Sequence, residues 1–291
     1  MNCPDYNSPA ELKKILEEHG FSMQKKFGQN FMLNPNARTK IASLLELSPS
    51  DQVWEVGPGL GCMTAEFLNS GASVKAFEID KGFIQLLHGI FQDEEKSGKL
   101  SIVEGDVLKN WEREYKNTQI PIKLAGNLPY NIAATFIAGT IQKSCPFERC
   151  VFTVQKEVAD RICAKPSSED YSSFSVLCQF AYDVKPSIEL GPGNFWPKPR
   201  VASKAVVLEK KASPVECLSP ELFVKLVHTL FLSRRKTIQN NIKPLLPKDI
   251  SQADFFAKAG ISPSERAENL TVAQFAALTD TLATAMKSGK N

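Results

Sequence analysis

The chain has 291 residues, enough for one large domain and a smaller companion, and its 43% hydrophobic content is ordinary for a soluble globular protein. The formal net charge is only +3, so the charge of the whole molecule is weak evidence for binding to nucleic acid. No apolar run is long enough to cross a bilayer, and residues 1–18 lack the apolar core of a signal peptide, so we expect a cytoplasmic protein that does not bind membranes.

The cysteines and histidines do not indicate a metal site. The seven cysteines are odd in number, no Cys-x-x-Cys unit occurs, and the three histidines do not stand near cysteines at ligand spacing. We therefore expect reduced, mostly buried thiols and no bound metal.

From residue 51 to 155 the chain repeats a pattern of apolar run, turn and helical stretch. The apolar runs at 53–57, 74–80, 100–106, 122–128 and 150–155 are expected to be strands. Helices are expected between them, most clearly at 63–70, 82–95 and 133–143. Apolar strands that alternate with helices indicate an α/β fold whose parallel sheet is covered on both faces. Such sheets bind ligands beyond the carboxyl ends of their strands.

The second half of the chain changes character near residue 213. Before that point we expect a helix at 156–164 and then two strands, 173–191 and 203–211, as antiparallel neighbours at one edge of the sheet. From Pro220 the pattern is helical, with breaks at Pro244, Pro247 and Gly260, and it ends in an apolar-periodic segment at 272–286. We predict two domains, 1–212 with a helical extension over about 1–50, and an all-helical 213–291.

A glycine-rich turn follows the first strand, in the sequence Glu55-Val-Gly57-Pro-Gly59-Leu-Gly61. Glycines let the backbone approach a ligand closely and open the next helix with free N–H groups. The spacing differs from the dinucleotide-binding G-x-G-x-x-G, which disfavours a nicotinamide oxidoreductase. A merely tight turn between strand and helix is the alternative.

Acidic residues stand at the next two strand ends. The second strand ends in Glu78-Ile-Asp80, and alternation turns Glu78 and Asp80 to the same face, so spacing does not show which of them accepts hydrogen bonds from a ribose. Asp106, after the third strand, can accept from an adenine amino group. Each acidic residue could instead cap a helix. Their joint placement favours a cofactor that contains adenosine.

The fourth strand runs into Asn127-Leu128-Pro129-Tyr130, which suits transfer of a methyl group to the N6 amine of adenine. That amine is a poor nucleophile because its lone pair is delocalised into the ring. The side-chain carbonyl of Asn127 and the backbone carbonyl of Leu128, held by Pro129, can accept both N6 protons and free the lone pair. Tyr130 offers a stacking face, worth about 1–3 kcal/mol. A proline turn with a core tyrosine is the alternative.

Two basic stretches contrast with the near-neutral balance. The segment FLSRRKTIQNNIK at 231–243 has four basic residues and no acidic one, and Lys198, Arg200 and Lys204 form a second stretch. Such local patches can contact phosphates. The run at 234–236 can equally be a solvated helix face.

Taken together, these motifs resemble the ribosomal RNA adenine N6,N6-dimethyltransferase family, in particular its bacterial small-subunit (kasugamycin-sensitivity) group. The resemblance spans about residues 25–241. It is carried by KKFGQNFM (25–32), EVGPGLG (55–61), EID (78–80), GD (105–106), GNLPYNIA (126–133), VQKEVADRI (154–162), FWPKPRV (195–201) and FLSRRKTIQNNI (231–242).

The resemblance implies a Rossmann-like class I methyltransferase domain with a small helical C-terminal domain, and S-adenosylmethionine as the cofactor. It favours Glu78 over Asp80 for the ribose, and Met32 replaces the usual leucine with similar volume. The implied cofactor residues are Gln29, Asn30, Met32, Gly57, Gly59, Glu78, Asp106 and Asn127.

The reaction centre that the resemblance implies consists of Asn127, Leu128, Pro129, Tyr130 and Phe195. Phe195 would close over the second face of the target adenine, with core packing as the alternative. The implied RNA-phosphate contacts come from Arg200, Arg234, Arg235 and Lys236.

The expected activity is dimethylation of two adjacent adenines in the 3′-terminal hairpin loop of small-subunit rRNA, by a monomer acting on small subunits or their assembly intermediates. Departures at 134–136 and 171–174 lie beside the reaction centre and concern fine substrate positioning. The alternatives are a macrolide-resistance methylase of large-subunit rRNA, a ribosome-assembly or transcription factor that needs no catalysis, and a DNA adenine methylase.

Overall fold

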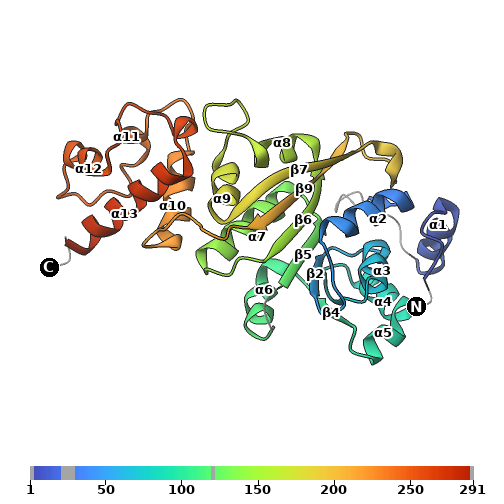
Figure 1. Cartoon of the computed structure of the whole chain (residues 1–291). Helices are drawn as coiled ribbons and strands as arrows, with labels where there is room; N and C mark the ends of the chain where they lie inside the picture. Colours follow the sequence, from blue (N-terminus) through green and yellow to red (C-terminus); the bar gives the residue numbers. More distant parts are fainter. Residues whose placement is uncertain (1–2, 21–29, 119–121, 289–291) are drawn as a thin grey trace. The chain divides into compact units, whose positions relative to one another are not determined.

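A computed structural model describes residues 3–20, 30–118 and 122–288 (Figure 1). Within these residues the main sheet has the strand order β4-β3-β2-β5-β6-β9-β7, and β1 pairs with β8 in a separate two-stranded sheet. The strands are β1 (Phe31–Met32), β2 (Gln52–Val56), β3 (Ser73–Glu78), β4 (Leu100–Glu104), β5 (Ile122–Asn127), β6 (Arg149–Gln155), β7 (Tyr182–Leu190), β8 (Phe195–Trp196) and β9 (Ser203–Lys210).

Helices connect most of these strands, and proline and capping residues mark where several of them begin. Ser8 caps α1 and Asn34 caps α2, each followed by a proline in the first turn. The helices are α1 (Pro9–Glu18), α2 (Pro35–Leu44), α3 (Cys62–Asn69), α4 (Lys81–Ile90), α5 (Gln92–Lys96), α6 (Val107–Lys116), α7 (Tyr130–Gln142), α8 (Lys156–Cys163), α9 (Ser173–Ala181), α10 (Pro220–Leu230), α11 (Ile238–Asn241), α12 (Gln252–Ala259) and α13 (Val272–Ser288), with 3-10 turns η2 (Pro192–Asn194) and η3 (Ala267–Asn269).

The strand pairing confirms the predicted α/β fold with a mostly parallel sheet. β2 pairs in parallel with both β3 and β5, β3 with β4, and β5 with β6, whereas β9 runs antiparallel to β6. The chain therefore builds the sheet first to one side of β2 and then, from β5 onward, to the other. Beyond the carboxyl ends of β2 and β5 lies the switch point where open sheets of this kind bind ligands.

The central strands are buried on both faces, as their apolar sequences predict. Four of the five residues of β2 are buried, and Trp54 within it is fully covered. Its indole packs against Phe77 and Phe147, with ring centroids 4.8 and 5.4 Å away. Aromatic packing from the neighbouring strand β3 and from the segment before β6 thus supports the sheet below the ligand-binding edge.

One sequence prediction is wrong. Residues 173–181, expected to begin a strand, form helix α9, and only 182–190 form a strand, β7, which is the neighbour of β9 at the sheet edge. Periodicity did not separate the two possibilities, because six of the nine residues of α9 are buried. The helix start is set by a capping box in which Ser172 and Ser175 each accept from the other's backbone.

The backbone divides into two compact units that the chain enters more than once. One comprises Met1–Ala133, Phe147–Ala159 and Lys185–Glu209, and the other Ala134–Pro146, Asp160–Val184 and Lys210–Asn291. The second unit contains the predicted C-terminal helices, and Gly260 ends α12 in the left-handed conformation, at φ 66°. The domain boundary at 212/213 stays a prediction.

No helix among the described residues is both long and apolar enough to cross a membrane. No disulfide links the seven cysteines, of which three are buried and Cys3 is exposed. The described residues also hold no group of three or more His, Cys, Asp or Glu side chains arranged for a metal ion.

Candidate active site

A cavity of about 320 Å³ lies at the switch point, beyond the carboxyl ends of the parallel strands. Most residues predicted from the sequence to bind the cofactor or the reacting base line it. They are Asn30, Met32, Gly57, Gly59, Glu78, Asp106, Asn127, Leu128 and Pro129. The fold therefore brings together residues that are almost a hundred positions apart in the chain.

The glycine turn has the backbone geometry that its sequence predicts. Gly59 has φ 57° and Gly61 has φ 82°, both in the left-handed region that a side chain disfavours. A Cβ atom at Gly59 would lie 3.0 Å from the ring of Phe31, and one at Gly61 would clash with Phe91. Glycine is thus required at both positions, for conformation and for close packing.

Glu78 and Asp80 both line the cavity, but their hydrogen bonds differ. Asp80 caps α4, accepting from Gly82 N at 2.8 Å. Glu78 instead turns toward the glycine turn: its Oε2 accepts from Gly59 N at 3.1 Å, and its Oε1 from the backbone N–H groups of residues 79 and 80. Burial raises the pKa of Glu78 above its usual value, although these backbone hydrogen bonds act in the opposite direction. The carboxylate is therefore fixed at the cavity wall.

Asp106 combines the two roles that were considered for it. It caps α6 through Oδ1, which accepts from Leu108 N at 2.9 Å, and it also lines the cavity. Its other oxygen, Oδ2, has no hydrogen-bond partner among the described residues. A helix cap and a ligand contact do not exclude each other, because a carboxylate has several acceptor positions.

Glu55 is a further carboxyl group in the cavity wall, and the sequence analysis gave it no role. It is buried and accepts a hydrogen bond from Thr64 Oγ1 at 2.5 Å. Burial, together with the nearby Glu78 charge, raises the pKa of Glu55 to about 8, against the effect of Thr64. Within the described residues no basic side chain forms an ion pair with Glu55, Glu78 or Asp106. The cavity is therefore an acidic environment suited to a cationic ligand.

Asn127, at the end of β5, is oriented by the chain itself. Its Nδ2 donates to the carbonyl of Asn30 at 3.3 Å, so the acceptor Oδ1 is on the other side of the amide. The carbonyl of Pro129 accepts from the N–H groups of Ile132 and Ala133 and is used by helix α7. The carbonyl of Leu128 remains the backbone acceptor assigned from the sequence.

Phe195 does not line the cavity. It is buried, 2% exposed, in the two-stranded sheet, where Met32 pairs with Phe195 and Phe31 with Trp196. Met32 itself lines the cavity, so the segment that carries Phe195 is joined by backbone pairing to a cavity strand. The predicted stacking of Phe195 on a target base stays a prediction.

Comparison with known proteins identifies the family. The family model described as ribosomal RNA adenine dimethylase matches residues 20–284 of the chain. The chain belongs to the ribosomal RNA adenine dimethylase family. Two relatives are named "Ribosomal RNA small subunit methyltransferase A". The one from Treponema denticola is 44% identical, and the match covers 96% of each chain. The one from Treponema pallidum is 42% identical, and the match covers 97% of this chain and 99% of the relative.

Solved structures agree on the fold of the family. A dimethyladenosine transferase from Plasmodium falciparum matches with TM-score 0.69 at 23% identity, covering 89% of this chain and 98% of that one. The 23S rRNA methyltransferase ErmE matches with TM-score 0.58 at 22% identity, covering 87% and 100%. These structures show the fold. The family match and the named relatives show that the chain is an S-adenosylmethionine-dependent methyltransferase that acts on adenine in ribosomal RNA, and the large-subunit and non-enzymatic alternatives are not favoured.

The cavity residues fit the family's cofactor. S-adenosylmethionine carries a ribose, an adenine and a cationic sulfonium, and the cavity offers a fixed carboxylate, a second carboxylate with a vacant acceptor atom, and an excess of acidic groups. Sequence reasoning missed the apolar part of the wall. Those side chains are Phe31, Ile41, Met63, Phe67, Phe77, Ile79, Phe83, Val107, Ile132 and Val151. Only the 55% exposure of Ile79 distinguishes one of them from an ordinary core residue, and exposure is not visible in the sequence.

Two predicted site groups lie outside what the structure describes: Gln29, and the side chain of Tyr130. The basic residues of the C-terminal unit are described. Arg235 and Lys236 are exposed in the turn between α10 and α11, which replaces the helix face considered from the sequence. Arg234 in the same turn already makes contacts within the chain: it donates to Glu268 Oε2 at 2.9 Å and to the carbonyl of Glu169 at 2.8 Å.

Proposed function

We propose that this chain dimethylates N6 of two adjacent adenines in the 3′-terminal hairpin loop of small-subunit rRNA, using four molecules of S-adenosylmethionine per RNA. Support for the small subunit comes from the name shared by relatives that are 36–44% identical over nearly the whole chain. The observation that carries the chemistry is the orientation of Asn127, whose Nδ2 is bound to Asn30 so that Oδ1 is available as an acceptor.

In the proposed complex the cofactor is held by residues of the cavity wall. Glu78 accepts from the ribose hydroxyls, and Oδ2 of Asp106 accepts from the adenine amino group. The left-handed glycines 57 and 59 let the backbone lie against the cofactor, which Asn30 and Met32 cover. When bound, the cofactor supplies an electrophilic methyl group on its sulfonium.

The chain's own contribution to the reaction is positioning. Asn127 Oδ1 and the Leu128 carbonyl accept hydrogen bonds from the two N6 protons, which localises the lone pair on nitrogen and directs it toward the methyl group. Pro129 stiffens the backbone at this point, and Tyr130 stacks on one face of the base. Phe195, which is buried in the two-stranded sheet, must become exposed to stack on the other face. Positioning of this kind can contribute about 7–11 kcal/mol to catalysis. Each methylation releases one N6 proton to solvent, so before the second methylation only one N–H remains to donate to Asn127 Oδ1 or to the Leu128 carbonyl.

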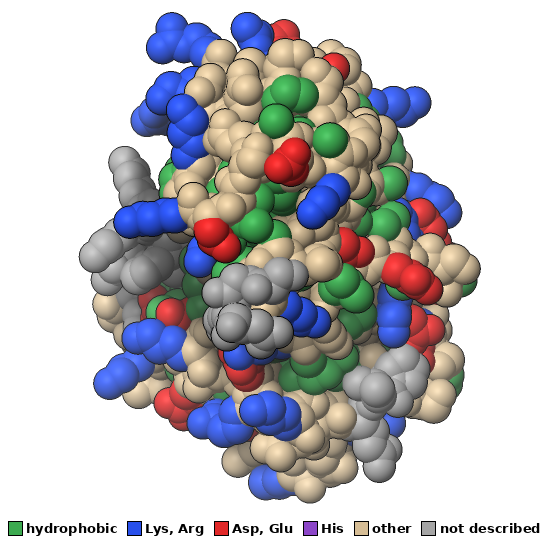
Figure 2. Space-filling model, turned by 90° about the vertical axis from the view of Figure 1, so that its left-hand side faces the viewer, with side chains coloured by type: hydrophobic (Ala, Val, Ile, Leu, Met, Phe, Trp, Pro, Cys, Tyr) green, Lys and Arg blue, Asp and Glu red, His purple; other side chains and the backbone are tan. Residues whose placement is uncertain are grey.

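RNA would be held by Arg200, Arg234, Arg235 and Lys236, and the contacts of Arg234 with Glu268 and Glu169 also stabilise the turn in which three of them lie. Arg200 is exposed after β8, as are Arg235 and Lys236 after α10. On the face drawn in Figure 2, Lys and Arg side chains are interspersed with acidic and apolar ones. We expect the double variant Arg235→Gln/Lys236→Gln to weaken RNA binding and to lower its salt dependence by about two phosphate contacts. Titrations from low to moderate salt measure this, and an unchanged slope would remove both residues from the interface.

The proposed setting is the cytoplasm, with a monomer acting on small subunits or their assembly intermediates. The deciding experiment gives the protein methyl-labelled S-adenosylmethionine and undermethylated small subunits, and maps the label by mass spectrometry. We expect N6,N6-dimethyladenine in the 3′-terminal loop, and a loss of at least about a hundredfold in rate for Asn127→Ala. Label in large-subunit RNA instead, or none in any ribosomal particle, would reject the proposal.

A further inference from the structure

Arg38, in helix α2, is a buried arginine held on all sides by the N-terminal part of the chain. Its side chain is 7% exposed. Nη1 donates to the carbonyls of Met32 at 3.1 Å and Leu33 at 2.6 Å. Nη2 donates to Asn7 Oδ1 at 2.9 Å, and Nε to Glu66 Oε1 at 3.2 Å. A guanidinium is the side chain that can hold several acceptors at once in fixed directions.

The two carbonyls that Arg38 binds lie at the end of β1, and β1 joins two parts of the site. On one side Met32 lines the cavity. On the other, β1 pairs antiparallel with β8, with Met32 opposite Phe195, and the N–H of Leu33 donates to the carbonyl of Asn194 at 2.8 Å. The guanidinium therefore fixes the strand through which the cavity and the Phe195 segment are connected.

Side-chain packing reinforces this connection. The ring of Phe31 stacks on Trp196, with centroids 6.2 Å apart, and meets Phe83 edge-on at 5.7 Å. Phe31 also lies so close to the glycine turn that a Cβ at Gly59 would be 3.0 Å from it. A shift of β1 would thus disturb the glycine turn and the Trp196 side chain together.

We propose that Arg38 is a positioning residue which, by fixing β1, couples occupation of the cofactor cavity to the placement of the Phe195 segment. The consequence for the target base rests on the proposed function of Phe195. A ligand that favours one arrangement of β1 shifts the same equilibrium for the second ligand, and the effect is reciprocal. Cofactor binding then tightens binding of the target RNA hairpin, and RNA tightens binding of the cofactor by the same factor.

The test measures binding and not only activity. The full chain is titrated with S-adenosylhomocysteine by calorimetry, with and without an RNA hairpin of the target sequence, and Trp196 fluorescence is followed as the difference from a Trp196→Phe variant. In the wild type we expect the Trp196 signal to change with S-adenosylhomocysteine. In Arg38→Met we expect S-adenosylhomocysteine to bind about tenfold more weakly and to cause no change in Trp196 fluorescence. The affinity for RNA should no longer depend on whether S-adenosylhomocysteine is bound.

Arg149 offers a matched control. It is also a mostly buried arginine, 14% exposed, that donates to a backbone carbonyl, that of Leu44, and pairs with Glu46, but it lies at the start of β6, at the opposite end of the strands. Arg149→Met should lower thermal stability without changing S-adenosylhomocysteine affinity or the Trp196 response. Equal effects of both variants on binding, or a purely thermal effect of Arg38→Met, would overturn the proposal.

Two milder variants keep the test open if Arg38→Met does not fold. Arg38→Lys retains the charge near Glu66 but cannot satisfy all four acceptors, and Glu66→Gln leaves both carbonyl contacts intact. We expect Arg38→Lys to lose most of the coupling and Glu66→Gln to keep most of it. The reverse order would contradict the proposal. A wild-type protein that shows the coupling but does not methylate small-subunit RNA would reject the proposed function and leave this inference standing.

Discussion

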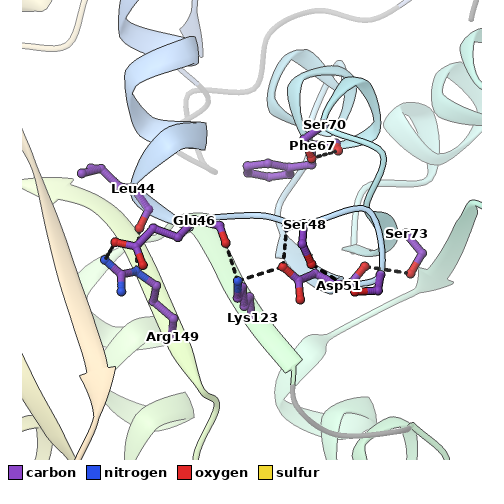
Figure 3. Close-up of polar contacts among 10 residues, drawn as sticks. Leu44, Glu46, Ser48, Asp51, Phe67, Ser70, Ser73, Lys123 and Arg149 are labelled. Atoms are coloured by element: carbon purple, nitrogen blue, oxygen red, sulfur yellow. Dashed lines mark hydrogen bonds and ion pairs between the residues drawn. The ribbon is translucent and has the colours of Figure 1, made fainter.

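The amino and carboxyl ends of the parallel strands differ in whether their charged side chains have partners of opposite charge. At the amino end the mostly buried cations Lys123 and Arg149 each have an acidic partner (Figure 3). Lys123 pairs with Asp51 at 2.8 Å and donates to the carbonyl of Glu46, and Arg149 pairs with the Glu46 carboxylate at 2.7 Å and donates to the carbonyl of Leu44. These contacts fasten the loop between α2 and β2 to strands β5 and β6.

At the carboxyl end the acidic groups, of which Glu55 and Glu78 are buried, have no counter-ions among the described side chains. Glu55, Glu78 and Asp106 accept hydrogen bonds from backbone N–H groups or from Thr64, and no described basic side chain pairs with them. The pKa values follow this difference. Burial alone would raise the pKa of Asp51, but hydrogen bonds from Lys123 and Ser48 outweigh burial and hold this pKa below its usual value. The pKa values of Glu55 and Glu78 lie above their usual values. One end stabilises the fold, and the other is arranged for a cationic ligand.

Among the substitutions that test this difference between the two ends, we expect the largest effect, on cofactor affinity, from a change at Glu78. Glu78→Gln keeps the shape and one acceptor but removes the charge, so two charge-assisted hydrogen bonds to the ribose become ordinary ones, at a loss of about 1–1.5 kcal/mol each. We expect S-adenosylhomocysteine to bind roughly a hundredfold more weakly by calorimetry. Some thermal stability should be lost as well, because both carboxylate oxygens accept from backbone N–H groups and the NH2 of glutamine cannot accept. A variant that loses stability but keeps its affinity would show that Glu78 serves the fold.

The complementary change at the amino end is Lys123→Met. It leaves Asp51 without its counter-ion, and since the two side chains are 11% and 18% exposed, solvent screens only part of the loss. We expect the free energy of unfolding in urea to fall by about 2 kcal/mol. Affinity for S-adenosylhomocysteine should stay within a factor of two, because the network lies at the far end of the strands. Weakened cofactor binding in a folded variant would mean that the two ends are not independent.

The carboxyl end was largely predictable from the sequence, and the amino end was not. Glycines, acidic residues and Asn127 stand directly after apolar runs, so strand order alone brings them together. Strand alternation left Glu78 and Asp80 equivalent, and only the structure shows that Asp80 is used as a helix cap. The pairs at the amino end join residues 72 and 103 positions apart through an irregular loop, for which the sequence carries no local signal.

The same limit explains the other misses. Strands β1 and β8 have two residues each, too few for any periodicity, so the pairing of Met32 with Phe195 and the role of Arg38 could not be foreseen. Helix α9 is buried nearly all round, so its sequence reads equally well as a strand. Local patterns therefore predicted elements and strand-end chemistry, whereas contacts between short or irregular segments required the three-dimensional structure.

The smallest effect, and the sharpest test of the unpaired carboxyl end, is the pH dependence that Glu55 contributes. Burial raises its pKa to about 8, so above the unfolded-state value of 4.5 the folded chain holds a proton that the unfolded chain has lost. The stability from this group is therefore complete below pH 4.5 and is lost as pH rises through about 8. Glu55→Gln cannot titrate, so its stability relative to wild type should rise as the pH increases from 5 to about 8 and change little above that.

Urea unfolding of both proteins at several pH values measures that difference. Asp51→Asn provides the opposite sign: the pKa of Asp51 is lowered, so its contribution is present above the unfolded pKa and is lost as pH falls, and the variant should flatten the acid side of the profile. If Glu55→Gln instead ran parallel to wild type from pH 5 to pH 9, Glu55 would be ionised in the folded chain. The cavity would then need a counter-ion, and the contrast between the two ends of the sheet would fail.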